Sequence, residues 1–483
     1  MKLKDLLKNM NVLELCADPE LEVASIAYDS RKVTPGSLFV AISGFASDGN
    51  RFIPMAMEKG AVVVVTAKKP AADVPYVLVE NDRLALAMLG TNYYGHPAED
   101  MTMIGITGTN GKTSTTLLLK QVLEKCLGAR VGLIGTMENL VGDEVIPTER
   151  TTPESLELQA LFARMRDAGC SHVVMEVSSH AITLDRVGGV HFDVAAFTNL
   201  TEDHLDFHKT MDAYCDAKAA LFTRCGKAVI NADDAYAPRM LAKADCPVIT
   251  TSVHDIGNLK AESLELHAEG IHFTAKMAGE RAAVSLPIPG KFTVYNALTV
   301  LGVAKQLGIS MADCAEALKT ARGVKGRVEV VPTPQTPYSV LIDYAHTPDG
   351  LENVISSVQD FCRGRVITVF GCGGDRDPMK RPIMGEIGVK LSDFAVITSD
   401  NPRTEDPDAI IADILKGVKP EYGAYKVVTN RREAIQYAMD IAEKDDIIIL
   451  AGKGHETYQE IHGVKYHLDE REEVAAHLPE LRK

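Results

Sequence analysis

The chain has 483 residues, too many for one ordinary hydrophobic core, so two to four domains are expected. Hydrophobic residues make up 46% of it and charged residues 24%, the balance of an ordinary globular protein. Its 51 basic and 66 acidic side chains leave a formal charge of -15, which argues against non-specific nucleic-acid binding, because that binding relies on Lys and Arg neutralising phosphates.

Neither a leader peptide nor a membrane span is expected from the sequence. Residues 1–16 include lysines but no apolar run long enough for a signal peptide, and the most apolar stretch, 61–66, has only the length of a strand. The nine cysteines show no CxxC or Cys/His zinc spacing, so reduced thiols are expected. We therefore expect a cytoplasmic protein that does not insert into membranes.

The first region, residues 1–98, is predicted to be a small α/β domain. The apolar runs at 37–41 and 61–65 have the length and composition of buried strands, and helix-like stretches lie between them. Residues 94–98 contain Gly95 and Pro97, which punctuate secondary structure, so a hinge is expected there.

The second region, residues 99–328, is predicted to hold a largely parallel sheet with crossover helices. Its first apolar strand, 103–107, leads into a glycine-rich loop and a helical run at 114–127. Helix-like stretches separate most of the later strand candidates, which favours parallel pairing. These later candidates are residues 131–134, 173–177, 194–197 and 228–230. The domain is expected to end near residues 323–327.

The third region, residues 329–483, repeats this alternation and is predicted to be Rossmann-like. Strands are expected at 339–342, 366–370, 394–397 and 447–450, with helical periodicity at 408–415 and 432–442. The sequence therefore predicts three α/β domains in series.

The glycine-rich loop is the strongest single motif. It consists of Gly108, Thr109, Asn110, Gly111, Lys112, Thr113 and Ser114. A strand, glycine loop and helix in this order aim backbone N–H groups at a phosphate; Lys112 can reach the β- and γ-phosphates, and the Thr113 hydroxyl can bind Mg²⁺. The general pattern has its first glycine where this chain has Ile106, so the loop is a variant. The alternative is a glycine turn beside a surface lysine, and the order of the elements favours nucleotide binding.

Two polar motifs follow later strands of the same predicted sheet. Glu176 ends one apolar strand, and a segment containing His204 follows the next. The carboxyl ends of parallel strands are where α/β sheets assemble their sites, so these two side chains are candidates for holding Mg²⁺. Histidine is an unusual ligand for so hard a cation. The alternative is that each side chain only caps a helix or supports the loop.

Together these motifs resemble the Mur ligase family, and the resemblance covers nearly the whole chain. It is carried by residues 108–114, 176–180, 199–204 and 214–222. It implies ATP on the glycine loop, with Lys112, Glu176 and His204 as catalytic residues and Thr113, Glu176 and His204 as metal contacts. It also implies a nucleotide-base contact from Asn296, and further ATP contacts, brought by a closing C-terminal domain, from Arg327, Asp343 and His346.

Lys218 belongs to the segment 214–222 and has two interpretations. A lysine on a helical stretch is most often a solvated surface charge. The resemblance implies instead that Lys218 is a catalytic residue and a metal contact, because it carries a carbamate, an N6-carboxylysine whose negative charge can face Mg²⁺.

Residues 28–41 and 48–49 resemble the uridine-binding domain of the family members that add the third peptide residue. The resemblance implies that a UDP-linked muramoyl dipeptide is contacted by Ser30, Thr151, Thr152, Ser178 and Arg186. Arg150 and Leu184 depart from some relatives and receive no role.

The third region contains a motif that resembles the signature of members selecting meso-diaminopimelate, namely Asp400, Asn401, Pro402 and Arg403. An arginine fork can bind the distal carboxylate, which lysine lacks, in a bidentate way. Arg376, Gly452 and Glu456 match further contacts to this amino acid. The alternative for the motif is an Asn-Pro turn with a surface arginine.

The implied activity is ATP-dependent ligation of meso-2,6-diaminopimelate to UDP-N-acetylmuramoyl-L-alanyl-D-glutamate through an acyl phosphate, in peptidoglycan precursor synthesis. The same ligase using L-lysine is one alternative, and a folate-extending ligase is another, although it would not need the domain around residues 29–31. A nucleotide-dependent switch without synthetic activity is a third, but the chain has no Asn-Lys-x-Asp guanine motif. Small-molecule partners and a monomer are expected.

Overall fold

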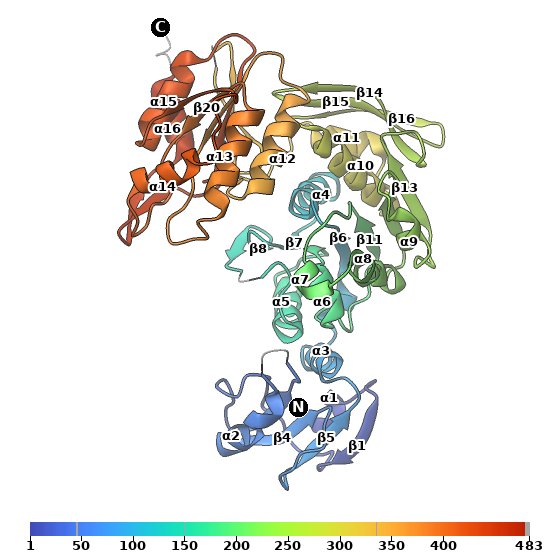
Figure 1. Cartoon of the computed structure of the whole chain (residues 1–483). Helices are drawn as coiled ribbons and strands as arrows, with labels where there is room; N and C mark the ends of the chain where they lie inside the picture. Colours follow the sequence, from blue (N-terminus) through green and yellow to red (C-terminus); the bar gives the residue numbers. More distant parts are fainter. Residues whose placement is uncertain (45–46, 149, 335, 479–483) are drawn as a thin grey trace. The chain divides into compact units, whose positions relative to one another are not determined.

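The structure is a computed structural model that describes residues 1–44, 47–148, 150–334 and 336–478. The chain divides into two compact units, and Figure 1 labels many of their helices and strands. Unit 1 consists of Met1–Lys260 with Leu298–Ser310, and unit 2 of Ala261–Ala297 with Met311–Lys483. Both units are built from α/β layers, as the sequence predicts.

The first part of unit 1 is a five-stranded sheet with the order β1-β5-β4-β3-β2. Its neighbours pair in parallel, except that β1 runs antiparallel to β5. The strands are β1 (Val12–Cys16), β2 (Ser25–Ala27), β3 (Ser37–Ala41), β4 (Ala61–Thr66) and β5 (Tyr76–Val79), and the helices are α1 (Leu3–Leu6), α2 (Ile53–Glu58) and α3 (Asp82–Tyr93). The predicted strands at 37–41 and 61–65 are confirmed, and their apolar side chains are buried because helices cover the sheet.

The rest of unit 1 is organised around β6 (Thr102–Thr107), which lies between β10 (His172–Glu176) and β11 (Val194–Phe197). These strands are parallel, with Glu176 opposite Ile106 and Phe197 opposite Thr107, so their carboxyl ends lie at one edge. The parallel set continues outward through β7 (Val131–Ile134) on one side, and through β12 (Ala228–Asn231) and β13 (Val248–Ser252) on the other.

Several antiparallel strands were not predicted. In unit 1, β8 (Asn139–Val141) and β9 (Glu144–Ile146) fold back on β7. Also unpredicted, the start of β14 (Leu259–His267) pairs in parallel with β13, and in unit 2 the antiparallel strands β15 (Gly270–Met277) and β16 (Glu280–Leu286) form a hairpin. Their polar, half-exposed residues hide them from a search for apolar runs, because an antiparallel sheet can leave one face in water.

Helices connect the strands and cover the sheet. The helical run predicted at 114–127 is confirmed as α4, which starts two residues earlier. The remaining helices of this region are α5 (Ser155–Asp167), α6 (Ser179–Thr183), α7 (Leu205–His208), α8 (Met211–Ala219), α9 (Ala237–Leu241), α10 (Lys291–Gln306) and α11 (Met311–Leu318), with α4 at Lys112–Leu127. Short 3-10 helices occupy Gly49–Phe52, Pro97–Asp100 and Ala220–Arg224.

The C-terminal part of unit 2 is a six-stranded sheet with the order β17-β18-β22-β19-β20-β21. All neighbours are parallel except β17 with β18. The strands are β17 (Glu329–Val331), β18 (Ser339–Asp343), β19 (Val366–Phe370), β20 (Phe394–Ile397), β21 (Ala424–Val427) and β22 (Ile447–Ala451), and a separate hairpin comprises β23 (Tyr458–Ile461) and β24 (Val464–His467). The four strands predicted for this region are β18, β19, β20 and β22, within one residue at each end.

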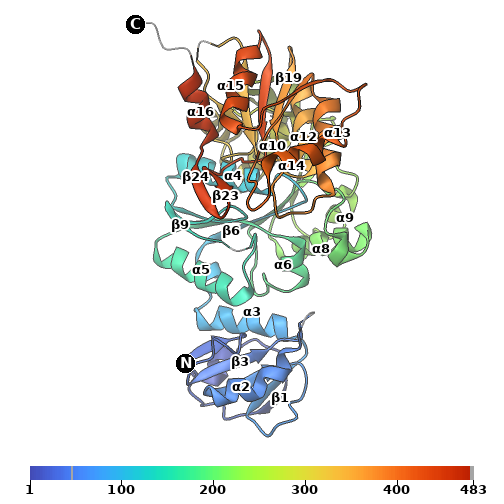
Figure 2. The same ribbon diagram turned by 60° about the vertical axis from the view of Figure 1, so that its left-hand side comes forward.

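Helices pack on both faces of this sheet (Figure 2). Leu341 packs in a cluster with α12 and α13, whereas its neighbours Val340 and Ile342 pack with α15 and α16, because successive side chains of a strand point to opposite faces. This is the doubly wound arrangement that the sequence predicts. The helices are α12 (Pro348–Gln359), α13 (Lys380–Leu391), α14 (Pro407–Leu415), α15 (Arg431–Ile441) and α16 (Glu470–His477).

Candidate active site

The predicted phosphate loop connects β6 to α4 and needs its glycines. Gly108 has φ 149° and Gly111 has φ 83°, conformations that residues with a Cβ rarely adopt. A Cβ on Gly108 would lie 1.9 Å from Oγ1 of Thr198, so a larger residue does not fit. Gly111 caps α4 without a side-chain acceptor, which leaves the first N–H groups of the helix open to an anion.

The end of β11 supports the loop from one side. The Asn110 N–H donates to Oδ1 of Asn199 at 2.9 Å, and the Thr109 N–H donates to the Asn199 carbonyl at 2.8 Å. The Thr198 hydroxyl donates to the Asn110 carbonyl at 2.7 Å. The conformation of the glycine loop is thus fixed by the neighbouring strand, and Thr198 and Asn199 are supporting residues that sequence reasoning did not assign.

Two predicted catalytic lysines meet at one carbonyl oxygen of the loop. Nζ of Lys112 donates to the Gly108 carbonyl at 3.0 Å and to the Thr109 carbonyl at 2.7 Å. Nζ of Lys218 donates to the same Gly108 carbonyl at 2.7 Å, and it lies 4.6 Å from the centre of the Tyr214 ring. The interpretation of Lys218 as a solvated surface charge is therefore wrong, because it is only 2% exposed.

The surroundings of both lysines disfavour the charged ammonium form. Burial lowers the pKa of Lys112, partly offset by the carboxylates of Glu176 and Asp203. Burial lowers the pKa of Lys218 well below its ordinary value, and the charge of Lys112 lowers it further. A neutral Lys218 amine is the form that these surroundings favour.

Glu176 lies at the carboxyl end of β10, as the sequence predicts, and is 1% exposed. Thr136 holds its carboxylate, with the backbone N–H donating to Oε1 at 2.9 Å and the hydroxyl donating to Oε2 at 3.1 Å. Thr136 was not predicted, because nothing in the sequence links it to a residue forty positions later.

His204 has a left-handed backbone, with φ 54°, and an exposed ring. Its ring centre lies 4.9 Å from that of His180 and 6.1 Å from that of Tyr214. Thr113, the remaining predicted metal contact, is the second residue of α4. Within the described part of the chain, no group of three or more His, Cys, Asp or Glu side chains is arranged to hold a metal ion.

Four of the five predicted dipeptide contacts are linked to the strand end at Glu176, either directly or through Thr152 or Thr136. The Thr152 hydroxyl donates to the Glu176 carbonyl at 2.9 Å, and the Ser178 N–H donates to Oγ1 of Thr152 at 3.2 Å. Nη1 of Arg186 donates to the Thr152 carbonyl at 3.2 Å. The Thr151 hydroxyl lies 3.0 Å from the hydroxyl of Thr136, which itself holds Glu176.

Arg186 shares a carboxylate that the sequence did not indicate. Its Nη2 lies 2.7 Å from Oε1 of Glu154, and Nη1 of Arg150 lies 2.5 Å from the same oxygen. Burial lowers the pKa of Arg186, and the charge of Glu154 opposes this shift. The carboxylate of Glu154 therefore lies between a predicted substrate arginine and Arg150, to which no role was assigned.

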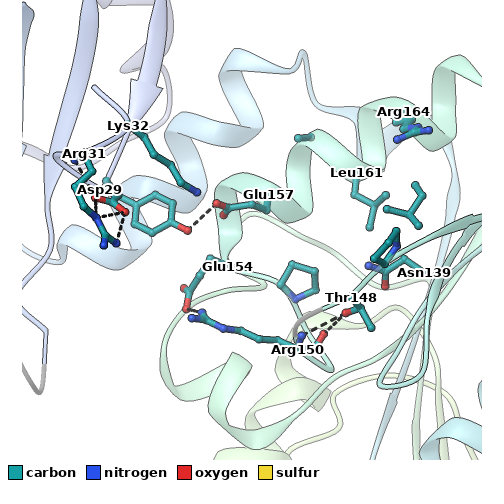
Figure 3. A pocket seen from close by; sticks show the side chains of 15 residues that line it. Asp29, Arg31, Lys32, Asn139, Thr148, Arg150, Glu154, Glu157, Leu161 and Arg164 are labelled. Atoms are coloured by element: carbon teal, nitrogen blue, oxygen red, sulfur yellow. Dashed lines mark hydrogen bonds and ion pairs between the residues drawn. The ribbon is translucent and has the colours of Figure 1, made fainter. Parts of the chain in front are cut away.

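A pocket of about 790 Å³ adjoins this region in unit 1 (Figure 3). The Tyr28 hydroxyl reaches across it to Oε1 of Glu157 at 2.6 Å. Ser30, the fifth predicted dipeptide contact, is 7% exposed and lies between two lining residues in the sequence, with its hydroxyl 3.5 Å from the sulfur of Met55. The charged lining residues are Asp29, Arg31, Lys32, Arg150, Glu154, Glu157 and Arg164.

A second pocket, of about 300 Å³, lies in unit 2 where β19, β20 and β22 end. It brings together nearly all the predicted amino-acid contacts, which are separated by up to eighty positions in the sequence. They are Arg376, Asp400, Asn401, Arg403, Gly452 and Glu456, and His346 also lines the pocket. Pro402 is not among the lining residues; its carbonyl faces Gly374, where a Cβ would come within 2.0 Å.

Hydrogen bonds fix the walls of this pocket. Nη1 of Arg403 donates to the Gly374 carbonyl at 2.8 Å, and its backbone is left-handed with φ 52°. The Asn401 side-chain amide donates to Oε2 of Glu456 at 2.8 Å, and its Oδ1 accepts a hydrogen bond from Nζ of Lys453 at 3.0 Å. The fully buried Lys453 was not predicted, although it lies beside the predicted Gly452.

The other predicted nucleotide contacts also belong to unit 2. Asp343 is 7% exposed, its Oδ2 accepts a hydrogen bond from the Val328 N–H at 2.8 Å, and burial raises its pKa. The Arg327 guanidinium lies 5.8 Å from the centre of the Tyr344 ring. His346 Nδ1 lies 2.8 Å from the Tyr344 carbonyl, and Asn296 is buried in α10.

Comparison with known proteins identifies the family to which the chain belongs. The chain is 47% identical, over all of both chains, to a UDP-N-acetylmuramoyl-L-alanyl-D-glutamate--2,6-diaminopimelate ligase of Clostridium tetani. It is 48% identical, again over all of both chains, to a ligase of the same name, numbered 1, from Clostridium acetobutylicum. The chain belongs to the Mur ligase family. The family's domain descriptions match it in order: "Mur ligase family, catalytic domain" at 22–94, "Mur ligase middle domain" at 106–304 and "Mur ligase, glutamate ligase domain" at 326–454.

The fold of this Mur ligase agrees with that of a solved relative. A structure described as UDP-N-acetylmuramoyl-L-alanyl-D-glutamate--2,6-diaminopimelate ligase aligns with 99% of this chain and 98% of its own, with a TM-score of 0.78 and 30% identity. No helix in the described ranges has both the length and the apolar character needed to span a bilayer.

Proposed function

We propose that this Mur ligase catalyses the ATP-dependent ligation of meso-2,6-diaminopimelate to UDP-N-acetylmuramoyl-L-alanyl-D-glutamate, in cytoplasmic synthesis of peptidoglycan precursors. Full-length relatives at 47% and 48% identity bear the name of a ligase with these substrates, which supports the proposal. We further propose that the protein acts as a monomer with domain limits 1–98, 99–328 and 329–483.

The observation that carries the amino-acid assignment is the composition of the 300 Å³ pocket. It is lined by the guanidinium groups of Arg376 and Arg403 and by the carboxylates of Asp400 and Glu456. An amino acid with carboxylate and ammonium groups at both ends offers partners to both kinds of side chain. Lysine lacks the distal carboxylate, so it would leave an arginine without its anion, and a site built this way rejects such an analogue strongly.

We assign ATP to the loop between β6 and α4. The open N–H groups at the start of α4 and the Lys112 ammonium provide positive charge for phosphates. Closing of the C-terminal domain would add the more distant contacts to the nucleotide. The proposed ATP contacts are Gly108, Thr109, Asn110, Gly111, Lys112, Thr113, Ser114, Asn296, Arg327, Asp343 and His346.

We propose that Lys218 is carbamylated. Burial and the charge of Lys112 lower the pKa of Lys218, which favours the neutral amine, and a neutral amine is the form that adds to CO₂. The nitrogen lone pair forms the N–C bond, one C=O π pair moves to oxygen, and a proton leaves the nitrogen. The product is an anion beside Lys112, which replaces a repulsion between two cations by an attraction.

Magnesium is the metal that these residues would hold, with Thr113, Glu176, His204 and carbamylated Lys218 as contacts. An uncarbamylated Lys218 does not suit the site, whereas a carbamate on Lys218 together with Glu176 would give the few carboxylates that Mg²⁺ takes along with substrate phosphates and water. When bound, the ion would supply positive charge that offsets the developing charge on the transferring phosphoryl group.

We propose that the UDP-linked dipeptide is held in unit 1. Thr151, Thr152, Ser178 and Arg186 would contact the dipeptide, and Ser30 the nucleotide end. The 790 Å³ pocket is lined by four cationic side chains and three carboxylates. Arg31 and Arg164 form ion pairs with Asp29 and Glu144, so Lys32 is the cation that we assign to an anionic occupant. Such local basic groups are needed because the whole chain carries a formal charge of -15.

The proposed reaction has two bond-forming steps. A carboxylate oxygen of the D-glutamate residue attacks the γ-phosphorus of ATP, the bond to the bridging oxygen breaks, and ADP leaves. The amine of diaminopimelate then attacks the acyl carbon, phosphate leaves with the C–O electron pair, and the nitrogen loses a proton. Lys112 stabilises charge on the phosphoryl group in the first step.

Phosphate release tests the proposal. With ATP, Mg²⁺ and UDP-N-acetylmuramoyl-L-alanyl-D-glutamate present, release should depend on meso-diaminopimelate and be at least about a hundredfold slower with L-lysine at equal concentration. Equal turnover with lysine would reject the amino-acid assignment. ATP hydrolysis that is indifferent to the muramoyl dipeptide would favour a nucleotide switch instead.

A further inference from the structure

A fully buried arginine lies beneath the 300 Å³ pocket, and none of the proposed contacts uses it. Arg431 is the first residue of α15 and is 1% exposed. Its Nη2 donates to the Ala451 carbonyl at 2.8 Å, and its Nε donates to Oε1 of Glu470 at 2.8 Å. One planar guanidinium thereby ties the end of β22, where Gly452 begins the pocket wall, to the start of α16.

The third nitrogen of this guanidinium is directed at the pocket. Nη1 of Arg431 lies 3.8 Å from Oδ2 of Asp400, which is close enough for charge attraction and too long for a hydrogen bond. Both atoms are buried and have no hydrogen-bond partner within residues 1–44, 47–148, 150–334 and 336–478. The other oxygen of Asp400, Oδ1, accepts a hydrogen bond from the Asn401 N–H at 2.7 Å.

Oδ2 of Asp400 faces Gly452 across the pocket wall. A Cβ at Gly452 would lie 2.5 Å from this oxygen, and both residues line the pocket. The oxygen that Arg431 holds only by charge is therefore a buried one at the pocket wall. The Asn401 N–H and the Lys453 ammonium, 4.0 Å away, both act on Oδ1, so Arg431 is the cation that holds Oδ2.

Arg431 keeps its charge in this buried place. Burial alone would lower its pKa, but the carboxylates of Glu470 and Asp400 raise it above its ordinary value. A buried ion pair of this kind is weak evidence for stability, because removing the charges from water costs about as much as their attraction gains. A role in fixing geometry explains better why a charged group occupies this position.

We propose that Arg431 is a positioning residue of the amino-acid pocket, which fixes the Asp400 carboxylate and the turn at Ala451 and Gly452 from the buried side. This inference rests on the proposed function, because it assumes that an amino acid binds in that pocket. Asp400 then lines the pocket with a carboxylate whose orientation is already fixed for an ammonium group of the ligand. Arg431 itself touches neither substrate nor nucleotide.

If Arg431 only stabilised the fold, its loss and the loss of the adjacent Arg432 should have similar effects on diaminopimelate binding. Arg432 therefore serves as a control that distinguishes a positioning role from a purely structural one. Arg432 also joins α15 to α16, through an ion pair with Glu473, and it donates to the His467 carbonyl at 2.5 Å. Its guanidinium is not among the groups that line the pocket or approach Asp400. Arg432→Met therefore removes a link between the same two helices without touching the proposed support.

The test is steady-state kinetics of the full-length protein with meso-diaminopimelate varied and the other substrates saturating. Arg431→Met combined with Glu470→Gln removes both charges of the buried pair, so that neither is left alone. We expect its KM for diaminopimelate to rise about tenfold or more, with kcat changed less than about threefold and KM for ATP unchanged. Arg432→Met should keep all three values.

An unchanged KM for diaminopimelate in a folded double variant would overturn the inference, as would the same rise in Arg432→Met. If the double variant does not fold, Arg431→Lys decides, because an ammonium keeps the charge but cannot make three directed contacts. Its KM should rise at least about fivefold, and an unchanged value would overturn the inference. Failure of the wild-type protein to use diaminopimelate would instead reject the proposed function.

Discussion

At the scale of single residues, Lys218 shows that a functional side chain can lower the stability of the folded state. Its ammonium is buried beside that of Lys112, and both donate to one carbonyl. Since the pKa of Lys218 is lowered on folding, the unfolded chain binds more protons between the two pKa values, and stability rises with pH through that window.

Replacing this lysine should therefore separate stability from activity. We expect Lys218→Met to stabilise the uncarbamylated protein by about 1–2 kcal/mol at neutral pH, because it removes a poorly solvated charge, and to weaken the rise of stability with pH. Turnover should fall by at least about a hundredfold, since the carbamate cannot form. Urea denaturation at several pH values and phosphate release measure the two effects. A less stable variant with normal pH dependence would contradict this account.

Gly108 has a steric requirement that can be tested against another glycine with positive φ. Gly108→Ala would place a Cβ 1.9 Å from Oγ1 of Thr198, whereas Gly128, with φ 60°, has open space where a methyl group would lie. We expect Gly108→Ala to cost about 2–4 kcal/mol and to abolish ATP binding, and Gly128→Ala to cost about 1 kcal/mol with ATP binding intact. Denaturant unfolding and calorimetric titration with ATP measure both. Equal costs for the two changes would mean that the loop can shift to accept a methyl group.

At the scale of elements, α8 carries the carbamate candidate, and its start depends on one side chain. Thr210 caps α8, with its hydroxyl accepting a hydrogen bond from the Ala213 N–H at 3.1 Å. Thr210→Ala should cost about 1 kcal/mol and lower turnover several-fold by loosening Tyr214 and Lys218, whereas Thr210→Ser keeps the acceptor and most of both properties. Thermal unfolding and phosphate release give the comparison. Indistinguishable Ala and Ser variants would show that α8 is held by packing alone.

The sequence predicts most of the buried parallel strands, for a physical reason, although it misses β2, β5, β13 and β21. Strands such as β19 and β22 are buried on both faces, so they are short continuous apolar runs bounded by turn residues. The hairpin of β15 and β16 alternates buried and exposed residues with charges between them, and its pairing depends on its neighbours. Propensity alone does not reveal such strands.

The candidate site likewise contains residues that the sequence predicts and residues that it does not. Gly108 and Lys112 are predicted because strand, loop and helix are contiguous in the sequence. Thr136 and Arg431 are missed because each acts on a residue more than thirty positions away, Glu176 and Asp400 respectively. Only a folded chain brings such partners together, and the resemblance to a family names only residues that match its motifs.

At the scale of the whole molecule, the proposed functions are distributed between the two compact units. The glycine loop and its lysines belong to unit 1, and the 300 Å³ pocket with Arg403 belongs to unit 2. The contacts that shape the glycine loop come from residues of unit 1, such as Asn199, and those that shape the pocket come from unit 2. Unit 2 would add its ATP contacts only when the C-terminal domain closes. The initial binding of ATP should therefore depend mainly on unit 1 and that of diaminopimelate on unit 2, and ligation should require both.

Two variants test this division. Arg403→Ala should reduce diaminopimelate-dependent phosphate release by at least about a hundredfold, because the distal carboxylate loses its bidentate partner, while the thermal shift produced by ATP stays as in the wild type. Lys112→Ala should abolish the ATP shift while diaminopimelate, added alone at high concentration, still raises the Tm. Loss of both ligand responses in either variant would mean that the two sites are coupled before ligation, since a defect confined to one unit cannot remove binding to the other.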